Sequence, residues 1–249
     1  MMSEPKYTDN FYQDLINSSH KSAAKIVPLV MDLVAPKSVV DVGCGVGVWL
    51  SIFRKHGVED FLGIDGSWVN KKYLQIPADR FLAHDLRLPL TVNRRFDLVV
   101  SLEAAEHVPS ECAEIFINSL VSFGPVVLFS AAIPSQGGIG HINEQWPDYW
   151  AKYFRIKGYV VVDYLRGAIW NEKVSPIYAQ NILLFIDEKY LKGQPALAEA
   201  YKKTDVATLC RVHPEFYAYR INPENMSLRE LLHAFPAVLR EYIVRKLKR

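Results

Sequence analysis

The residues whose types and spacing suggest chemistry begin with a glycine-rich segment, Asp41 to Gly47 (DVGCGVG). It lies between a β-branched run at residues 39–42 and a helix-forming stretch at residues 49–56. Glycines at such a turn let the backbone approach a ligand closely, and the following helix offers unpaired N–H groups. Asp65 ends the next apolar run and follows the last glycine by 18 residues. A carboxylate there can accept hydrogen bonds from both ribose hydroxyls, so the pattern predicts a nucleoside-shaped ligand.

The spacing also bears on which nucleoside-shaped ligand is bound. Dinucleotide sites use GxGxxG, whereas the third glycine here comes one residue earlier, at Gly47. Asp41 would repel a pyrophosphate, but it suits a ligand that carries an amino group and a positive charge. A nicotinamide-dependent oxidoreductase is therefore the alternative enzyme class, and a glycine turn without a ligand is the structural alternative.

The elements around this segment predict an α/β fold. Short, almost continuously apolar runs alternate with helical stretches, which is typical of a doubly wound parallel sheet covered on both faces. Strands are expected at residues 39–42, 61–65, 80–84, 96–102, 126–129, 159–164 and 179–186, with helices at residues 22–33, 49–56 and 111–123. A turn-rich stretch at residues 167–176 separates the last two strands, so we expect a hairpin and one antiparallel strand.

Three segments are expected along the chain. Residues 1–35 are predicted to form an N-terminal helical lid, residues 36–187 the ligand-binding core, and residues 188–249 a C-terminal helical extension. The extension ends in a basic amphipathic helix, residues 228–248. We expect this helix to pack on the core or on a second copy of the chain in a homodimer. Contact with a membrane or with a glycan-assembly enzyme is the alternative.

Taken together and in this order, the motifs resemble those of class I S-adenosylmethionine-dependent methyltransferases, over residues 38–186. The family's motif I, (D/E)xGxGxG, is met by residues 41–47, and its acidic residue after strand two by Asp65. Residues 96–103 (FDLVVSLE), followed by EHV at residues 106–108, are typical of the branch that methylates small molecules. The resemblance implies a seven-stranded, mainly parallel, Rossmann-like sheet whose last strand is antiparallel and inserted at the edge. It also implies S-adenosylmethionine as cofactor and S-adenosylhomocysteine as product.

The resemblance further implies which residues bind the cofactor. In that family the loop at Gly45 and Gly47 packs against the methionine part, and Asp65 holds the ribose. Asp85 and its neighbour Leu86 frame the adenine, and the end of strand four lies beside the sulfonium. The predicted cofactor-binding residues are Asp41, Gly43, Cys44, Gly45, Gly47, Asp65, Gly66, His84, Asp85, Leu86, Ser101, Leu102 and Glu103.

Methyl transfer to an alcohol oxygen needs a positioned nucleophile and a base, whereas an amine needs no base. The segment at residues 130–150 is glycine-rich and then aromatic, which makes it a candidate lid, and it carries His141, Asn143, Glu144 and Gln145. We predict His141 as the base with Glu144 beside it, and His107 as the second catalytic candidate. The alternatives are that His141 and Asn143 cap a helix at residues 144–153, and that His107 supports the cofactor loop. Predicted substrate contacts are Tyr12, Asn143 and Trp146.

The acceptor is expected to be a hydroxyl on a small molecule or a glycan. Residues 101–104 (SLEA) lack an Asn-Pro-Pro-Tyr motif, which disfavours methylation of nucleic acid bases or protein amides. The spacing of His141, Glu144 and Asp148 is no established ligand pattern, so no metal is predicted. A non-catalytic module that binds the cofactor is a further alternative.

Composition limits the partners and the compartment. The chain has 249 residues, 50% apolar and 22% charged, as in an ordinary globular protein. A net charge of +2 argues against nucleic acid as partner. Three dispersed cysteines, a polar N-terminus without a signal peptide and short apolar runs indicate a cytoplasmic protein with no integral membrane segment.

Overall fold

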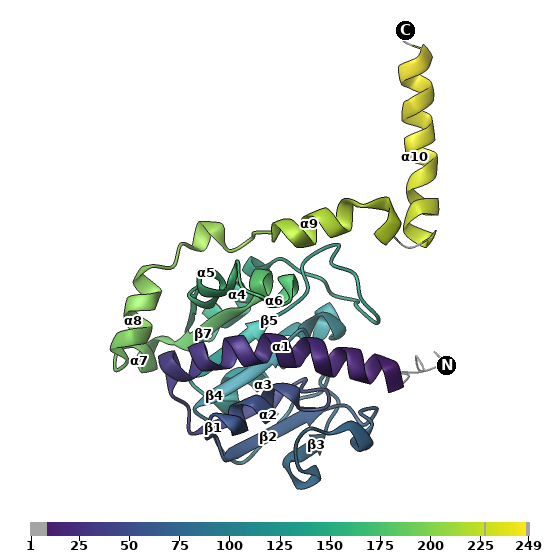
Figure 1. Ribbon diagram of the computed structural model, residues 1–249. Helices are drawn as coiled ribbons and strands as arrows, with labels where there is room; N and C mark the ends of the chain where they lie inside the picture. Colours follow the sequence, from purple (N-terminus) through teal and green to yellow (C-terminus); the bar gives the residue numbers. More distant parts are fainter. Residues whose placement is uncertain (1–8, 227, 248–249) are drawn as a thin grey trace. The chain divides into compact units, whose positions relative to one another are not determined.

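Seven strands form one sheet in the order β3-β2-β1-β4-β5-β7-β6 (Figure 1). The computed structural model describes residues 9–226 and 228–247. The chain divides into two units, residues 1–211 and 212–249, and the sheet belongs to the first. The strands are β1 (Ser38–Val42), β2 (Asp60–Asp65), β3 (Phe81–Ala83), β4 (Leu98–Leu102), β5 (Val126–Ser130), β6 (Tyr159–Val162) and β7 (Leu183–Asp187).

The pairing confirms the predicted mainly parallel sheet. β1 pairs in parallel with β2 and β4, β2 with β3, and β4 with β5. β7 runs antiparallel to both β5 and β6, as expected for one late strand. It lies between those two strands, so the expectation that it sits at the edge of the sheet is wrong, and β6 is the edge strand.

The connection between β6 and β7 differs from the predicted turn. It contains the short helices α5 (Leu165–Ile169) and α6 (Pro176–Asn181). Residues 179–181, expected in a strand, therefore belong to α6. Pro176 occupies the first turn of that helix, where its missing N–H costs nothing and its fixed φ favours helix formation.

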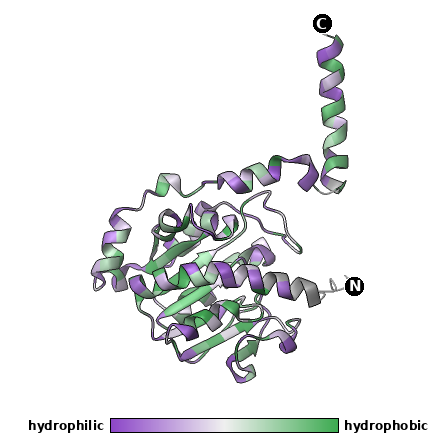
Figure 2. Cartoon of the chain, viewed as in Figure 1, coloured by the Kyte–Doolittle hydropathy of each residue, from purple (hydrophilic) through white to green (hydrophobic). Residues whose placement is uncertain are grey.

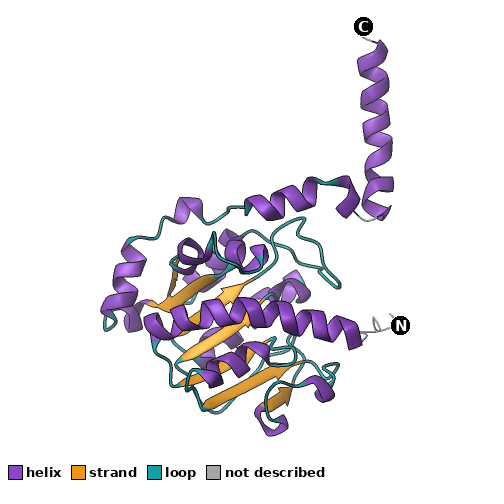
Figure 3. Cartoon of the chain, in the orientation of Figure 1, coloured by secondary structure: helices purple, strands orange, loops and turns teal. Residues whose placement is uncertain are grey.

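Helices cover both faces of the sheet, which explains why the strands are apolar without alternation (Figure 3). Val39, Leu98 and Val126 point into a cluster with helices α1, α2, α5, α6, α7 and α8. The residues that follow each of them, Val40, Val99 and Val127, point into the opposite cluster with α3 and α4. These helices are α1 (Asp9–Val34), α2 (Val48–Lys55), α3 (Ala113–Phe123), α4 (Pro147–Ile156), α7 (Glu188–Leu191) and α8 (Pro195–Lys202).

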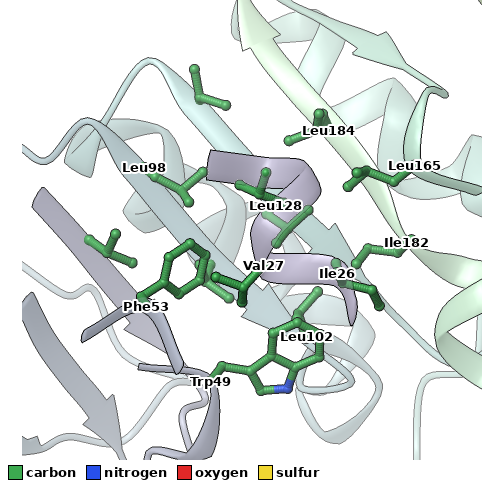
Figure 4. Packing of buried hydrophobic residues seen from close by; sticks show 14 of the residues in the cluster. Ile26, Val27, Trp49, Phe53, Leu98, Leu102, Leu128, Leu165, Ile182 and Leu184 are labelled. Carbon is green, nitrogen blue, oxygen red and sulfur yellow. The ribbon is translucent and has the colours of Figure 1, made fainter. Parts of the chain in front are cut away.

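Helix α1 is longer than the predicted helix at residues 22–33, and it continues through Pro28. Its fully buried residues Ile26 and Val27 pack beside Trp49 and Phe53 of α2 (Figure 4). The second half of α1 is thus part of the hydrophobic core and packs on the same face of the sheet as α2 (Figure 1).

A buried ion pair fastens the segment after α8 to the core. The Arg166 side chain of α5 has no exposed surface, and its guanidinium donates to both carboxylate oxygens of Asp163, at 2.9 and 2.6 Å. It also donates to the carbonyl oxygens of Gln180, at 3.0 Å, and Leu209, at 2.7 Å. One side chain therefore links α5, the end of α6 and residues 205–209.

The second unit contains α9 (Pro214–Ile221) and α10 (Leu228–Leu247). The predicted helix at residues 228–248 is thereby confirmed to within one residue. Apolar and polar residues alternate along α10 (Figure 2), and Leu232, Phe235 and Val238 are exposed. Within residues 9–226 and 228–247, no helix has both the length and the apolarity that a membrane crossing needs.

Candidate active site

The glycine-rich turn between β1 and α2 needs glycine for reasons of conformation and space. Gly43, Gly45 and Gly47 have φ of 86°, 53° and 82°, a region that residues with a Cβ rarely adopt. A Cβ on Gly43 would also lie 2.4 Å from the Cβ of Ala104. The amides of Gly43 and Cys44 donate to the Ile64 carbonyl oxygen, at 2.8 and 3.2 Å, so the turn is held against the end of β2.

Asp65 ends β2 and faces this turn. Its Oδ2 accepts from the Gly45 amide at 2.7 Å, and its Oδ1 accepts from the Gly66 amide at 2.6 Å. Burial raises the pKa of Asp65, and the two amides oppose that rise. Each carboxylate oxygen has two acceptor positions, so each can accept one more hydrogen bond, which is what a ribose diol requires.

Asp41, in β1, is a buried carboxylate with an unsatisfied atom. Its exposed fraction is 1%, and its Oδ2 has no hydrogen-bond partner among the described residues. Burial raises the pKa of Asp41 well above its ordinary value, and the charge of Asp65 adds to the rise. A ligand that places a cation here would relieve both effects.

This environment predicts that Asp41→Asn stabilises the ligand-free protein. Above the ordinary pKa of 3.8, the unfolded chain ionises Asp41 while the folded chain still holds the proton. The free energy of unfolding therefore falls as pH rises from about 4 towards the raised pKa. Asparagine carries no such charge, so we expect Asp41→Asn to raise the free energy of unfolding by about 1–2 kcal/mol at pH 7 and by less at pH 4.

Urea unfolding of both proteins at the two pH values measures this difference. The exposed Asp79 provides a matched control, because Asp79→Asn should leave stability unchanged at both pH values. A gain from Asp41→Asn that is equal at pH 4 and pH 7 would contradict the account.

The predicted adenine-side residues follow β3. The His84 amide donates to the Asp65 carbonyl oxygen at 2.8 Å, which places this segment beside the end of β2. Leu86 is buried and lies next to Gly43. Asp85 is paired with Arg87, whose Nε donates to it at 2.9 Å, and this bond holds the pKa of Asp85 below its usual range.

The end of β4 carries the remaining predicted cofactor residues. Leu102 is largely buried, and Ser101 is fully buried, with a hydroxyl that has no partner within the part of the chain that the structure describes. Glu103 has a φ of 51°, and its amide donates to the Ser130 carbonyl oxygen at 3.0 Å. The strained backbone directs the Glu103 carboxylate into a network of amides.

The amides of this network belong to Gln136 and Asn181, which the sequence patterns did not predict as site residues. Gln136 donates to Glu103 Oε2 at 2.6 Å, and Asn181 donates to Glu103 Oε1 at 3.1 Å. Burial raises the pKa of Glu103, and these hydrogen bonds oppose the rise. Burial also raises the pKa of Tyr178 to about 12, and the nearby carboxylates Glu103 and Asp41 contribute. No local pattern marks α6 as part of the site, because Tyr178 and Asn181 reach it only through the fold.

Three predicted catalytic residues lie in one cluster, together with Glu106. His141 Nδ1 donates to Glu144 Oε1 at 2.9 Å, and the Gly137 amide donates to the same oxygen at 2.6 Å. The rings of His107 and His141 meet edge to face, with centroids 4.9 Å apart. Burial lowers the pKa of His107, and His141 contributes to that shift. Burial raises the pKa of Glu106 well above its usual range, with Glu103 adding to the rise.

The alternative helix-capping roles are wrong. Helix α4 begins at Pro147 with Trp146 at its N-cap, and no side chain caps it. Asn143 is instead buried in the loop, where its backbone N–H donates to the backbone carbonyl oxygen of Glu106 at 3.0 Å. Trp146 is 39% exposed and remains available to a substrate. Tyr12 belongs to α1, but its side chain lies outside the described residues.

Comparisons with known proteins bear on the family and the fold. The family model of a methyltransferase domain matches residues 17–164. DesVI of Streptomyces venezuelae is 16% identical with a TM-score of 0.56, over 74% of this chain and 99% of DesVI. An O-methyltransferase family protein of Burkholderia thailandensis is 14% identical with a TM-score of 0.53, over 72% of this chain and 60% of that protein. Magnesium protoporphyrin IX methyltransferase (ChlM) of Synechocystis PCC 6803, with bound S-adenosylmethionine, is 22% identical with a TM-score of 0.50. The match covers 72% of this chain and 86% of ChlM.

Proposed function

Because the chain belongs to the class I S-adenosylmethionine-dependent methyltransferases, we propose that it methylates a hydroxyl oxygen of a small molecule or a glycan. S-adenosylmethionine, its methyl donor, supplies a methyl carbon activated by the sulfonium. Membership of this family excludes the nicotinamide-dependent oxidoreductase and the non-catalytic module as alternatives.

The residues at the strand ends fit this donor. Asp41 offers a buried carboxylate whose Oδ2 lacks a partner within the described ranges, and the donor carries an ammonium group and a sulfonium. The glycine turn leaves room for the methionine part at Gly45, where even an added Cβ would meet no atom within 4 Å. Asp65 would hold the ribose with the acceptor positions left free by Gly45 and Gly66.

This assignment predicts that Asp65→Ala weakens binding of S-adenosylhomocysteine at least about tenfold, since hydrogen bonds to a charged group contribute about 1.5–3 kcal/mol each. Calorimetric titration measures the affinity. Asp79→Ala removes an exposed carboxylate from the segment before β3, and it should bind like the unmodified protein. Equal affinities for Asp65→Ala and the unmodified protein would contradict the ribose contact.

The observation that favours a hydroxyl acceptor is the oriented pair of His141 and Glu144. The carboxylate holds the imidazole through Nδ1, which directs Nε2 towards Glu106 Oε1, 3.8 Å away. An alcohol has a high pKa and needs such a group to activate it, whereas an amine does not. His107 lies against the same ring, so we assign the two histidines and Glu144 to acceptor activation. Asn143 and Trp146 line the same loop and are proposed to contact the acceptor.

A methyl-labelled donor tests this function. The protein is incubated with the donor and three acceptor sets: glycosides and alcohols with free hydroxyls, primary amines, and carboxylates. We expect label on the hydroxyl set. Label found on amines alone would contradict the proposal even if S-adenosylhomocysteine binds.

We also propose a reducing, cytoplasmic setting. Cys44, Cys112 and Cys210 are all free thiols, and Cys44 is buried in the glycine turn. Cell fractionation that places the protein in an oxidising compartment would contradict this assignment.

A further inference from the structure

Glu106 is a buried carboxylate whose oxygens make no well-aligned hydrogen bond within the described ranges, although its own amide and that of Ala132 lie near enough to oppose the rise in its pKa. Its exposed fraction is zero, and neither Oε1 nor Oε2 has a hydrogen-bond partner among residues 9–226 and 228–247. Burying a carboxylate without a partner is costly, so such groups in folded proteins are paired or bind metal ions. The side chains around Glu106, which are those of His107 and His141, indicate what kind of ligand would pair with the carboxylate.

Two imidazoles stand beside Glu106, and each is already oriented through Nδ1. His107 Nδ1 lies 3.2 Å from the carbonyl oxygen of Gly140, and His141 Nδ1 lies 2.9 Å from Glu144 Oε1. An Nδ1–H bonded to a carbonyl or a carboxylate leaves Nε2 as an unprotonated ring nitrogen with a free lone pair. Metal-binding histidines are held in this way by carboxylates and carbonyls behind them.

We propose that Glu106, His107 and His141 bind one divalent transition-metal cation. One potential ligand atom from each residue lies within 4.8 Å of the other two. His141 Nε2 is 3.8 Å from Glu106 Oε1, which is too long for a hydrogen bond. Two ligands about 2.1 Å from a tetrahedral ion lie about 3.4 Å apart, so Glu106 and His141 need a shift of a few tenths of an ångström, and a pair at the 4.8 Å limit needs about 1.4 Å.

The chemistry of the ligand set selects the kind of cation. Two imidazole nitrogens and one carboxylate suit zinc, cobalt, manganese or ferrous ions, whereas magnesium and calcium prefer oxygen ligands throughout. Three protein ligands leave at least one coordination position open, as in catalytic rather than structural sites. This set differs from the His141, Glu144 and Asp148 pattern in the sequence, because Glu144 supports His141 from behind.

The backbone holds the ligands in place. The amides of Ile142 and Asn143 both donate to the Glu106 carbonyl oxygen, at 3.0 Å each. These bonds tie the loop that carries His141 to the segment after β4 that carries Glu106 and His107. The two segments that carry the proposed ligands are therefore hydrogen-bonded to each other without an ion.

The inferred role of the cation rests on the proposed function, whereas its binding does not. An acceptor oxygen could take the open coordination position, close to the end of β4 where the methyl donor is expected. With the cation bound, His141 Nε2 is a ligand, so the cation and not the imidazole would lower the pKa of the acceptor hydroxyl. A cation would then both position a hydroxyl and favour oxygen over a protonated amine as the acceptor.

Cobalt and zinc binding test the site without any methyl transfer. The full chain, free of affinity tags and treated with a chelator, is titrated with Co²⁺ by calorimetry and by visible absorption, and then with Zn²⁺. We expect one equivalent of Co²⁺ with ligand-field bands that report the coordination, and displacement of Co²⁺ by Zn²⁺. Glu106→Gln and His107→Ala should each weaken binding at least about 100-fold, and Glu144→Gln about 10–100-fold.

Asp148→Ala is the matched control, because this exposed carboxylate lies outside the cluster and its removal should leave Co²⁺ affinity unchanged. Circular dichroism checks that each variant is folded. The proposal is overturned if the intact protein takes up no cation, or if Glu106→Gln and His107→Ala bind Co²⁺ as the intact protein does. Cation binding without methyl transfer to any hydroxyl would instead overturn the proposed function and leave the site standing.

Discussion

Replacement of His141 by glutamine is expected to slow methyl transfer by about 10²–10⁴-fold while S-adenosylhomocysteine binds as before. Glutamine keeps much of the size of the side chain but cannot act as a base of suitable pKa or as an imidazole ligand. His141 is positioned by Glu144 and faces Glu106, whereas the glycine turn and Asp65 are held by separate hydrogen bonds. The loss should therefore appear in the rate of transfer and not in cofactor affinity.

Single-turnover kinetics with labelled donor measure the transfer rate, and calorimetry measures S-adenosylhomocysteine affinity. His56→Gln provides the control, because His56 is exposed at the C-terminal end of α2 and should behave like the unmodified protein. A His141→Gln variant with more than a tenth of the normal rate would remove His141 from the mechanism.

Arg166→Met is expected to lower the free energy of unfolding by about 3–5 kcal/mol, because it removes one partner of a buried ion pair. Methionine matches the length of the side chain but leaves the carbonyl oxygens of Gln180 and Leu209 without this donor. Asp163 keeps the contact with the partly exposed Arg211. Urea unfolding followed by circular dichroism measures the change.

An exposed arginine on α2, Arg54, gives the comparison, since Arg54→Met should change stability by less than about 0.5 kcal/mol. The effect of Arg166→Met should not depend on bound S-adenosylhomocysteine beyond the general stabilisation that any ligand provides. A loss below about 1 kcal/mol would show that the guanidinium is not needed to fasten residues 205–209 to the core.

Residue type and local spacing were sufficient to place the glycine turn and Asp65 beside each other at one end of the sheet. The glycines of residues 43–47 were predicted correctly because a turn with positive φ is a local backbone property. Asp65 follows a continuous apolar strand, and the end of such a strand in a parallel sheet lies beside the ligand-binding turn of its neighbour. The same local patterns placed six strands to within two residues, since buried parallel strands are recognisable by their unbroken apolar runs.

Contacts between distant residues were decided only by the tertiary structure. β7 lies between β5 and β6, and helix α6 precedes it. The sequence of a short segment does not show which strand will pair with it. The same holds for the amides around Glu103 and for the meeting of His141 with Glu106 and His107. By itself the sequence determined the backbone of the glycine turn and where most strands lie along the chain, because those follow from local sterics and burial. The fold decided which polar side chains surround Glu103, because Gln136 and Asn181 come from segments far from it in the chain and reach it only through packing.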